Sequence, residues 1–310
     1  MEVKIIKVLS LFDGISCGRV ALERAGIPVE KYYASEIDKY AIQVAQKNYP
    51  DTIQVGDVTQ IDGSKFRDID ILIGGSPCQG FSFAGKQLNF EDPRSRLFFE
   101  YVRILNKAKP KYFLLENVKM KKEHQDVIST CLGVEPIKIN STLVSAQNRE
   151  RLYWTNISNI VQPEDKKIFL SDILESGYVD SVKSYCIDAS YFKGGNLKSY
   201  FEKHRRQIVF EVPVKYNRKD LIKSEIEKAL TLLSSDWLRL NRNQDQNCVL
   251  YTTDGGITFY IRKLTPIECE RLQTLPDNYT DGISNTQRYK CIGNGWTVDV
   301  ISHIFGFLNT

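Results

Sequence analysis

Hydrophobic and polar positions follow a regular pattern over the first 170 residues of the chain. Short apolar runs of the length of buried strands alternate with longer segments whose apolar residues recur every three or four positions, as on one face of a helix. The runs that predict strands are residues 3–9, 31–35, 52–55, 69–73 and 112–115, and the segments that predict helices are 18–25, 39–48 and 95–107. Regular alternation of this kind is typical of an α/β protein with a doubly wound, mostly parallel sheet.

The pattern changes after residue 168. From 185 to 260 the apolar runs are shorter and are separated by turn signals such as Gly194-Gly195. We therefore expect two domains: one formed by residues 1–170 together with 285–310, and a smaller, loop-rich one with some β structure formed, with its hinge, by residues 171–284.

Helix boundaries are marked by capping residues in two places. Asp38 can cap a helix over residues 39–48. Thr265-Pro266-Ile267-Glu268 has the form of a capping box with proline at the first helical position, so a helix begins there. The apolar segment 297–307 is expected to form the last helix.

Two predicted strands end on residues that can do chemistry. Residues 69–73 lead through Gly74 and Gly75 into Ser76-Pro77-Cys78-Gln79, which presents a thiol, and residues 112–115 lead into Glu116-Asn117-Val118. Open α/β sheets build their sites at the carboxyl ends of their strands. A nucleophile and a carboxyl group are thus expected at one edge of the sheet.

Three other strand ends carry groups that suit a nucleoside. The first strand ends in Phe12-Asp13-Gly14, the second on Glu36, whose carboxylate can accept from ribose hydroxyls, and the third near Asp57, which can accept from an adenine amino group. The chain has neither GxGxxG nor a P-loop, so a pyrophosphate site is not supported. The three positions fit a nucleoside without phosphates, such as S-adenosylmethionine.

Composition narrows the class of protein. The chain has 310 residues, 42% of them hydrophobic, and a net charge of +4, with no apolar stretch of membrane-spanning length and no signal peptide. Its seven cysteines are scattered without a CxxC pair, so neither a disulfide framework nor a zinc site is expected. Most are interpreted as reduced, small hydrophobic residues, and Cys78 is the one whose setting suggests chemistry. We expect a cytoplasmic protein.

Several motifs in order along the chain resemble those of the DNA (cytosine-5)-methyltransferases. They are Phe12-Asp13-Gly14, Ser76-Pro77-Cys78-Gln79, Glu116-Asn117-Val118, Gln147-Asn148-Arg149-Glu150-Arg151, Arg262-Lys263-Leu264-Thr265-Pro266, Glu268, Arg271-Leu272-Gln273, Pro276 and Gly293-Asn294-Gly295-Trp296-Thr297-Val298. The resemblance covers nearly the whole chain, and both ends are similar to the subgroup of phage and de novo methyltransferases. It implies a Rossmann-like, S-adenosylmethionine-dependent catalytic domain and a smaller target-recognition domain.

The resemblance also implies catalytic roles. Cys78 would add to C6 of cytosine, and because a free thiol with a pKa of about 8.5 is only slightly ionised at neutral pH, we expect its surroundings to favour the thiolate. Glu116 would hold a proton against ring N3, which requires a raised pKa of its carboxyl group. Arg149 and Arg151, on one face of an apparent strand, would respectively hold the loop of Cys78 and contact the base oxygen O2.

The implied cofactor is S-adenosyl-L-methionine, with S-adenosyl-L-homocysteine as product and no metal. By the same resemblance, the cofactor-binding residues would be Phe12, Gly14, Glu36, Ile37, Asp57, Val58, Pro77 and Asn294.

The implied partner is double-stranded DNA, from which the target base must be flipped. Residues 79–97 are expected to form a loop that closes on the DNA. Basic residues of the smaller domain would meet phosphates or read guanine, and the sequence does not sort one role from the other. These are Lys193, Lys198, Lys203, Arg205, Arg206, Arg239 and Arg242. We expect a monomer in a prokaryotic or phage-infected cell, associated with the nucleoid, with a cognate restriction endonuclease as a candidate partner.

Three alternatives stay open at this point. One branch of the family methylates tRNA, and the smaller domain gives no decisive cue against that substrate. A catalytically inactive DNA-binding regulator would not need Cys78, Glu116 and Arg151, which are all present. An unrelated small-molecule methyltransferase would not need the second domain.

Overall fold

The computed structural model describes residues 5–76, 96–194, 200–211, 247–250 and 257–308. The strands are β1 (Ile6–Leu11), β2 (Val29–Ser35), β3 (Ile53–Gln54), β4 (Ile71–Gly74), β5 (Tyr112–Val118), β6 (Ile137–Asn140), β7 (Glu150–Thr155), β8 (Ile208–Glu211), β9 (Asn247–Leu250) and β10 (Ile257–Lys263). The α-helices are α1 (Cys17–Arg24), α2 (Lys39–Asn48), α3 (Arg96–Ala108), α4 (Lys122–Leu132), α7 (Pro266–Leu272), α8 (Asn285–Asn294) and α9 (Val298–Phe305).

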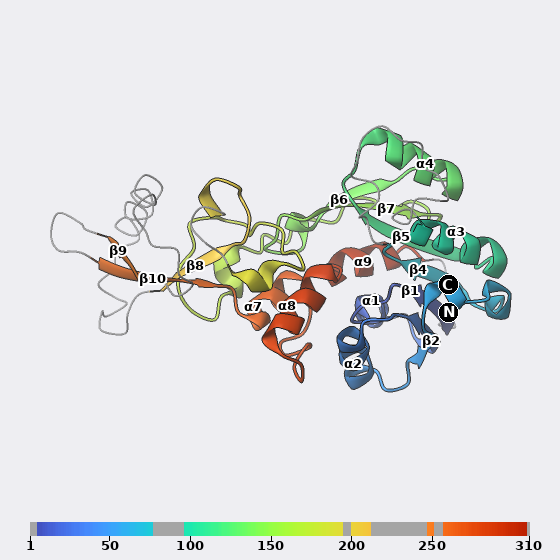
Figure 1. Cartoon of the computed structure of the whole chain (residues 1–310). Helices are drawn as coiled ribbons and strands as arrows, with labels where there is room; N and C mark the ends of the chain where they lie inside the picture. Colours follow the sequence, from blue (N-terminus) through green and yellow to red (C-terminus); the bar gives the residue numbers. More distant parts are fainter. Residues whose placement is uncertain (1–4, 77–95, 195–199, 212–246, 251–256, 309–310) are drawn as a thin grey trace.

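The larger sheet has seven strands in the order β3-β2-β1-β4-β5-β7-β6 (Figure 1). Pairing is parallel from β3 to β5, and β7 runs antiparallel to both of its neighbours. The strand order reverses between β1 and β4, so the connections that leave these two strands diverge and a crevice opens at their carboxyl ends. The predicted doubly wound, mostly parallel α/β sheet is confirmed.

Both faces of this sheet are buried, which explains why its strands read as continuous apolar runs. Alternate residues of one strand enter different cores: Val8 and Ile73 belong to a cluster with α1, α2 and α9, whereas Leu9, Leu11 and Leu72 belong to a cluster with α3 and α4. The C-terminal helix α9 therefore completes the same layer as the first helix of the chain.

The local capping signals are confirmed by side-chain hydrogen bonds. The carboxylate of Asp38 accepts from the backbone N–H groups of Tyr40 and Ala41 at the start of α2. At the start of α7, the Thr265 hydroxyl accepts from the Glu268 N–H at 3.1 Å, and the Glu268 carboxylate accepts from the Thr265 N–H at 2.8 Å.

Several strands extend beyond their predicted bounds: β1 runs to Leu11, β2 begins at Val29, and β5 has the longest extension. β5 continues from Leu115 through Val118, because residues Leu114 to Val118 pair with β7. Glu116 and Asn117 therefore lie within a strand rather than just after it. The pattern also missed α4, β6 and α8, whose formation depends on packing against the sheet and its neighbours.

A second sheet, with the antiparallel order β8-β10-β9, lies at the opposite end of the molecule from the seven-stranded sheet, with α7 and α8 between them (Figure 1). A third apolar cluster contains Leu272 of α7 and Ile292 of α8. Val209 of β8 and Leu170 belong to the same cluster. β8 is thus packed on the helices that precede α9.

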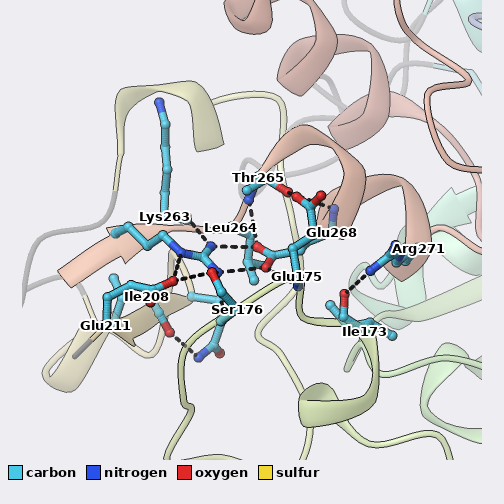
Figure 2. A network of polar contacts seen from close by, with 12 residues as sticks. Ile173, Glu175, Ser176, Ile208, Glu211, Lys263, Leu264, Thr265, Glu268 and Arg271 are labelled. Carbon is cyan, nitrogen blue, oxygen red and sulfur yellow. Dashed lines mark hydrogen bonds and ion pairs between the residues drawn. The ribbon is translucent and has the colours of Figure 1, made fainter. Parts of the chain in front are cut away.

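Near the end of β10, Arg262 contacts Ser176, Glu211 and Glu268, which belong to the polar network drawn in Figure 2. Its Nε lies 2.8 Å from Oε1 of Glu211, its two terminal nitrogens lie 2.7 and 2.8 Å from the carboxylate oxygens of Glu268, and Nη2 donates to the carbonyl of Ser176 at 2.7 Å. Glu268 is fully buried, and its Oε1 also accepts from the N–H of Glu175 at 2.9 Å. The guanidinium of Arg262 therefore joins β10, β8 and the segment at Ser176 to the start of α7.

Within the described part of the chain, no helix is both long enough and apolar enough to cross a membrane.

Candidate active site

A cavity of about 640 Å³ opens at the carboxyl edge of the seven-stranded sheet, where β1, β2, β4 and β5 end. Of the sequence-predicted site residues, Pro77 and Cys78 lie outside the described residues. All the others line this one cavity: Phe12, Gly14, Glu36, Ile37, Asp57, Val58, Glu116, Arg149, Arg151 and Asn294. The expected loop over residues 79–97 also falls largely outside the described part of the chain.

The end of β2 is joined to the end of β1 through one carboxylate. Oε2 of Glu36 accepts from the backbone N–H of Gly14 at 2.8 Å, and Oε1 accepts from the N–H groups of Ile37 and Asp38 at 2.7 and 2.9 Å. Carboxylate oxygens can accept more than one hydrogen bond each, so ribose hydroxyls can still donate to Glu36. The side chain thus shapes the cavity as well as offering acceptors to it.

The turn after β1 has an unusual backbone. Phe12 and Gly14 both have positive φ, 57° and 61° respectively, and no atom lies within 4 Å of the position that a Cβ of Gly14 would occupy. This open space beside the backbone is the close-approach surface that a flat nucleoside needs. Together with the acceptors of Glu36 and Asp57 it fits S-adenosylmethionine, although Asp57 also caps a short 3₁₀ turn by accepting from the N–H of Thr59.

Asp13 stabilises this turn through hydrogen bonds to neighbouring hydroxyl groups. Its carboxylate accepts from the hydroxyls of Ser16 at 2.5 Å and Tyr32 at 2.7 Å. Burial raises the pKa of Asp13 above its ordinary value, while hydrogen bonds from Ser10, Ser16 and Tyr32 oppose that rise. Asp13 therefore supports the cavity floor and does not line it.

The side of the cavity at the end of β5 contains an ion pair. Nε of Arg151 lies 2.9 Å from Oε1 of Glu116, and the two side chains are only 13% and 11% exposed. Arg151 is further fixed by donation from Nη1 to the Glu150 carbonyl. The positive and negative groups that the sequence placed on different elements thus meet across the β5–β7 pairing.

The chain before Cys78 passes very close to this pair. A Cβ on Gly75 would lie 2.9 Å from Nε1 of Trp296 and 3.1 Å from Oε2 of Glu116, so a larger residue would have to displace these side chains. The side-chain amide of Asn117 donates to the carbonyl and hydroxyl oxygens of Ser76, both at 3.3 Å. The entry to the Pro77-Cys78 segment is therefore held against Glu116.

Arg149 is buried and its guanidinium joins two walls of the cavity. Nη1 donates to the carbonyl of Ile187 at 2.8 Å, and Nη2 donates to the carbonyls of Gly295 at 3.0 Å and Gly293 at 3.4 Å. Burial lowers the pKa of Arg149 from its ordinary value. Its expected contact with the loop of Cys78 falls outside the described residues.

Sequence reasoning missed one wall of the cavity, the segment from Cys186 to Ser190. The sequence did not single out Cys186, but its side chain is exposed and Sγ lies 3.4 Å from Nη1 of Arg149 and 3.8 Å from Nη2 of Arg151. No local signal could have revealed this, because the arginines are more than 30 positions away in sequence. By contrast, Cys17 and Cys291 are buried, and burial raises the pKa of each thiol to about 12.

Among the described residues, no group of three or more histidine, cysteine, aspartate or glutamate side chains is arranged to hold a metal ion. The carboxylates of Glu36 and Asp57 suit a nucleoside without phosphates, and the Glu116–Arg151 pair suits the edge of a planar base.

Comparison with known proteins decides the family. The sequence model described as C-5 cytosine-specific DNA methylase matches residues 6–309. The chain belongs to the C-5 cytosine-specific DNA methylase family. It is therefore a methyltransferase enzyme, and the family implies S-adenosylmethionine as methyl donor.

Bacterial and phage relatives extend over nearly the whole length of this family member. Type II methyltransferase M.NlaX of Neisseria lactamica is 34% identical, with 96% of this chain and 94% of the relative covered. Type II methyltransferase M.HhaI of Haemophilus parahaemolyticus is 30% identical, with 96% and 93% covered. The orphan methyltransferase M.SPRI of Bacillus phage SPR is 29% identical, with 97% and 96% covered.

Solved structures share the fold of this family member at lower identity. A mutant of Spodoptera frugiperda DNMT2 is 20% identical with a TM-score of 0.65, covering 97% of this chain and 99% of that one. A DNA modification methyltransferase from an Escherichia coli prophage, described as putative, is 20% identical with a TM-score of 0.61, covering 97% and 98%.

Proposed function

We propose that the chain is a DNA (cytosine-5)-methyltransferase that flips a cytosine out of duplex DNA, adds the Cys78 thiolate to C6 and methylates C5. The observation that carries this proposal is the cavity itself. It places the Glu116–Arg151 pair, which suits a pyrimidine edge, in one space with Gly14 and Glu36, which suit a nucleoside. The type II and orphan relatives support DNA as the substrate.

The chemistry requires electron density at C5 of a ring that is a poor nucleophile. Addition of the Cys78 thiolate to C6, with a proton delivered to N3 from Glu116, turns the ring into an enamine that attacks the methyl group. S-adenosylmethionine supplies that methyl group as an electrophile. A base then removes the C5 proton, Cys78 leaves, and N3 gives up its proton.

The described residues suggest how the base would be held. Arg151 can donate to the base oxygen O2 while keeping Glu116 oriented, because Nε faces the carboxylate and each terminal nitrogen has a second N–H beside the one directed at the Glu150 carbonyl or at Sγ of Cys186. Arg149 fixes the cavity walls on either side. Flipping the target base costs a few kcal/mol, which contacts of this kind must offset.

The methyl donor would be held at the other side of the cavity. We assign Glu36 to the ribose, Asp57 to the adenine amino group, and Phe12 to packing against the cofactor, with Gly14, Ile37, Val58, Pro77 and Asn294 around them. The N–H groups that Glu36 already accepts from would keep its carboxylate in place when a ribose arrives.

We further propose that residues 171–284 form the target-recognition domain and hinge, and that residues 1–170 and 285–310 form the catalytic domain. The chain would act as a monomer on DNA in the cytoplasm of a prokaryotic or phage-infected cell, in association with the nucleoid. A type II setting would add a cognate restriction endonuclease, whereas an orphan setting would not.

The test is transfer of labelled methyl from S-adenosylmethionine to unmethylated duplex DNA, with tRNA in parallel and Cys78→Ala as the control. We expect label in DNA that is lost in Cys78→Ala, while the variant still binds S-adenosylhomocysteine. Label in tRNA alone would replace DNA with RNA as the substrate. Turnover of Cys78→Ala near the wild-type rate would overturn the assignment of the nucleophile.

A further inference from the structure

The cavity wall from Cys186 to Ser190 carries a charged contact that the proposed mechanism does not use. Asp188 lines the cavity, and its Oδ2 accepts from Nη2 of Arg205 at 2.5 Å. The side chain of Arg205 is 59% exposed and that of Asp188 is 38% exposed, so the pair lies where the cavity meets solvent. One member of the basic cluster His204-Arg205-Arg206 is thus brought to the mouth of the active site.

The backbone around Asp188 is fixed from several sides. The N–H of Ile187 donates to Gln147 at 2.9 Å and its carbonyl accepts from Arg149 at 2.8 Å. Gly293 of α8 packs so closely on this segment that a Cβ there would lie 2.3 Å from the carbonyl carbon of Asp188. The N–H of Ser190 donates to Oδ1 of Asp188. The position of Asp188 is therefore fixed by packing against α8 and by hydrogen bonds of the neighbouring residues.

The turn that presents Arg205 is held in an unfavourable conformation. His204 and Arg206, on either side of it, both have left-handed backbones, with φ of 48° and 59°. Side chains of non-glycine residues disfavour this region, and such strain persists only where neighbouring contacts impose it. Those contacts are His204 Nδ1 with the Tyr185 hydroxyl at 3.2 Å, and Arg206 Nη1 donating to the Gly194 carbonyl at 3.2 Å. Because His204 and Arg206 are each held by a contact of their own, the backbone between them is fixed, and the side chain of Arg205 extends to Asp188.

A flipped nucleotide brings a phosphate to this place. Cys186 contacts both Arg149 and Arg151, and two residues of chain span at most about 7 Å, so Asp188 is close to the arginines that would hold the base. A base that reaches Arg151 stays attached to its sugar and phosphate, which must lie at the mouth of the cavity. A DNA phosphodiester and a carboxylate each carry one negative charge and each offer two oxygens to a guanidinium, so the phosphate can take the place of Asp188 as the partner of Arg205.

We propose that Arg205 is a phosphate-binding residue for the flipped nucleotide, and that Asp188 is the anion it exchanges for that phosphate. This inference rests on the proposed function. In the free enzyme Asp188 neutralises Arg205 and keeps it at the cavity mouth. When DNA is bound, the guanidinium pairs with the phosphate, and Asp188, being partly exposed, is solvated by water at little cost. Arg205 thereby takes a positioning role on the backbone and reads no base.

The first experiment compares wild type, Arg205→Ala and Arg205→Lys in binding duplex DNA at several salt concentrations with S-adenosylhomocysteine present. Loss of one phosphate contact should weaken binding about tenfold and reduce the slope of log K against log salt by about 0.9. Arg205→Lys should keep most of the slope. Lys107→Ala is the matched control, because Lys107 is an equally exposed, ion-paired cation on α3 outside the cavity. An equal loss in Lys107→Ala would overturn the assignment in favour of general charge.

The second experiment locates the phosphate. Two duplexes each carry a single uncharged methylphosphonate, one on the 5′ side and one on the 3′ side of the mapped target cytosine. The wild type should bind one of them more weakly than the unmodified duplex, whereas Arg205→Ala should bind that duplex and the unmodified one with equal affinity. Additive losses at both positions would overturn the proposal. Asp188→Asn should bind DNA at least as tightly as wild type, and a loss equal to that of Arg205→Ala would overturn the exchange.

Methyl transfer separates this inference from the proposed function. Arg205→Ala should raise KM for DNA with little change in kcat and in cofactor binding. A wild-type enzyme that methylates no DNA would remove the proposed function itself. A wild-type enzyme that methylates DNA, with an Arg205→Ala variant identical to it, would remove only the role of Arg205.

Discussion

Arg151 and Glu116 are paired across two antiparallel strands, with Nε of the guanidinium 2.9 Å from Oε1 of the carboxylate. The pairing fixes both groups in one nearly buried place before any base arrives. A site whose polar groups are already oriented loses little free energy to reorganisation when the base arrives or the reaction proceeds. The pair also shows that the motifs around Glu116 and Arg151, which are distant in sequence, form one site.

Replacing Glu116 with glutamine tests the role of its proton. The amide has the same size but cannot pass a proton to ring N3, so Glu116→Gln should lower kcat by about 100-fold or more, the usual contribution of a general acid. Steady-state methyl transfer to DNA measures kcat, and unfolding by heat serves as the folding control. A kcat within a few-fold of wild type in a folded variant would contradict the assigned role.

Gly75→Ala should disturb the site without removing any functional group. The added methyl would press on Nε1 of Trp296 and Oε2 of Glu116, displacing the carboxylate and the start of the Pro77-Cys78 segment. We expect a clear loss of methyl-transfer rate with little change in melting temperature. The double variant Gly75→Ala/Trp296→Phe, which makes room on one side, should recover part of the rate. If it recovers none, crowding by the indole is not the cause.

Glu36→Ala should weaken cofactor binding more than DNA binding. The change removes acceptors for the ribose and also releases the N–H of Gly14, so calorimetry should show about 10-fold or greater loss of affinity for S-adenosylhomocysteine. Asp62→Ala is the matched control, since Asp62 also caps a backbone N–H, that of Ser64, but lies outside the cavity. A larger loss of DNA affinity than of cofactor affinity would refute the role of Glu36.

The protonated carboxyl group of Asp13 contributes to the free energy of unfolding, and this contribution decreases as pH rises. Because burial raises its pKa in the folded chain above the unfolded value of 3.8, the folded state binds this proton more tightly. The stabilising component is complete below that unfolded pKa and is lost as pH rises through the folded pKa. Asp13→Asn should remove it, so the difference in unfolding free energy between wild type and variant, measured by denaturant titration, should change from pH 4 upward. A difference that is constant with pH would show that Asp13 does not titrate differently on folding.

Arg262→Met should destabilise the protein by about 3 kcal/mol or more. The change would leave the fully buried Glu268 carboxylate without its cation, and an uncompensated buried charge is costly. Arg271→Met, which breaks the more exposed pair with Asp277, should cost about 1 kcal/mol or less for that pair. Denaturant unfolding of both variants measures the difference, and equal costs would show that the buried network does not carry special weight.

Local signals were the most reliable part of the sequence reading. Asp38 and the Thr265–Glu268 capping box mark helix starts correctly because a cap depends on residues within one turn. The end of β5 was misplaced because its last residues are held by pairing with β7, which follows some 30 positions later. The wall from Cys186 to Ser190 was missed for the same reason, since its contacts are with β7 and α8.

Although α4, β6 and α8 were missed, the alternation of strands and helices, the apolar runs that bury both faces of the sheet, and the motifs near the carboxyl ends of its strands could be predicted from the sequence alone. These depend on periodicity and on short-range chemistry. The meeting of distant groups could not be predicted in this way: Glu116 with Arg151, Gly75 with Trp296, and Asp188 with Arg205. Such pairs are fixed by how strands and loops pack in three dimensions, and the chain carries no local record of that packing.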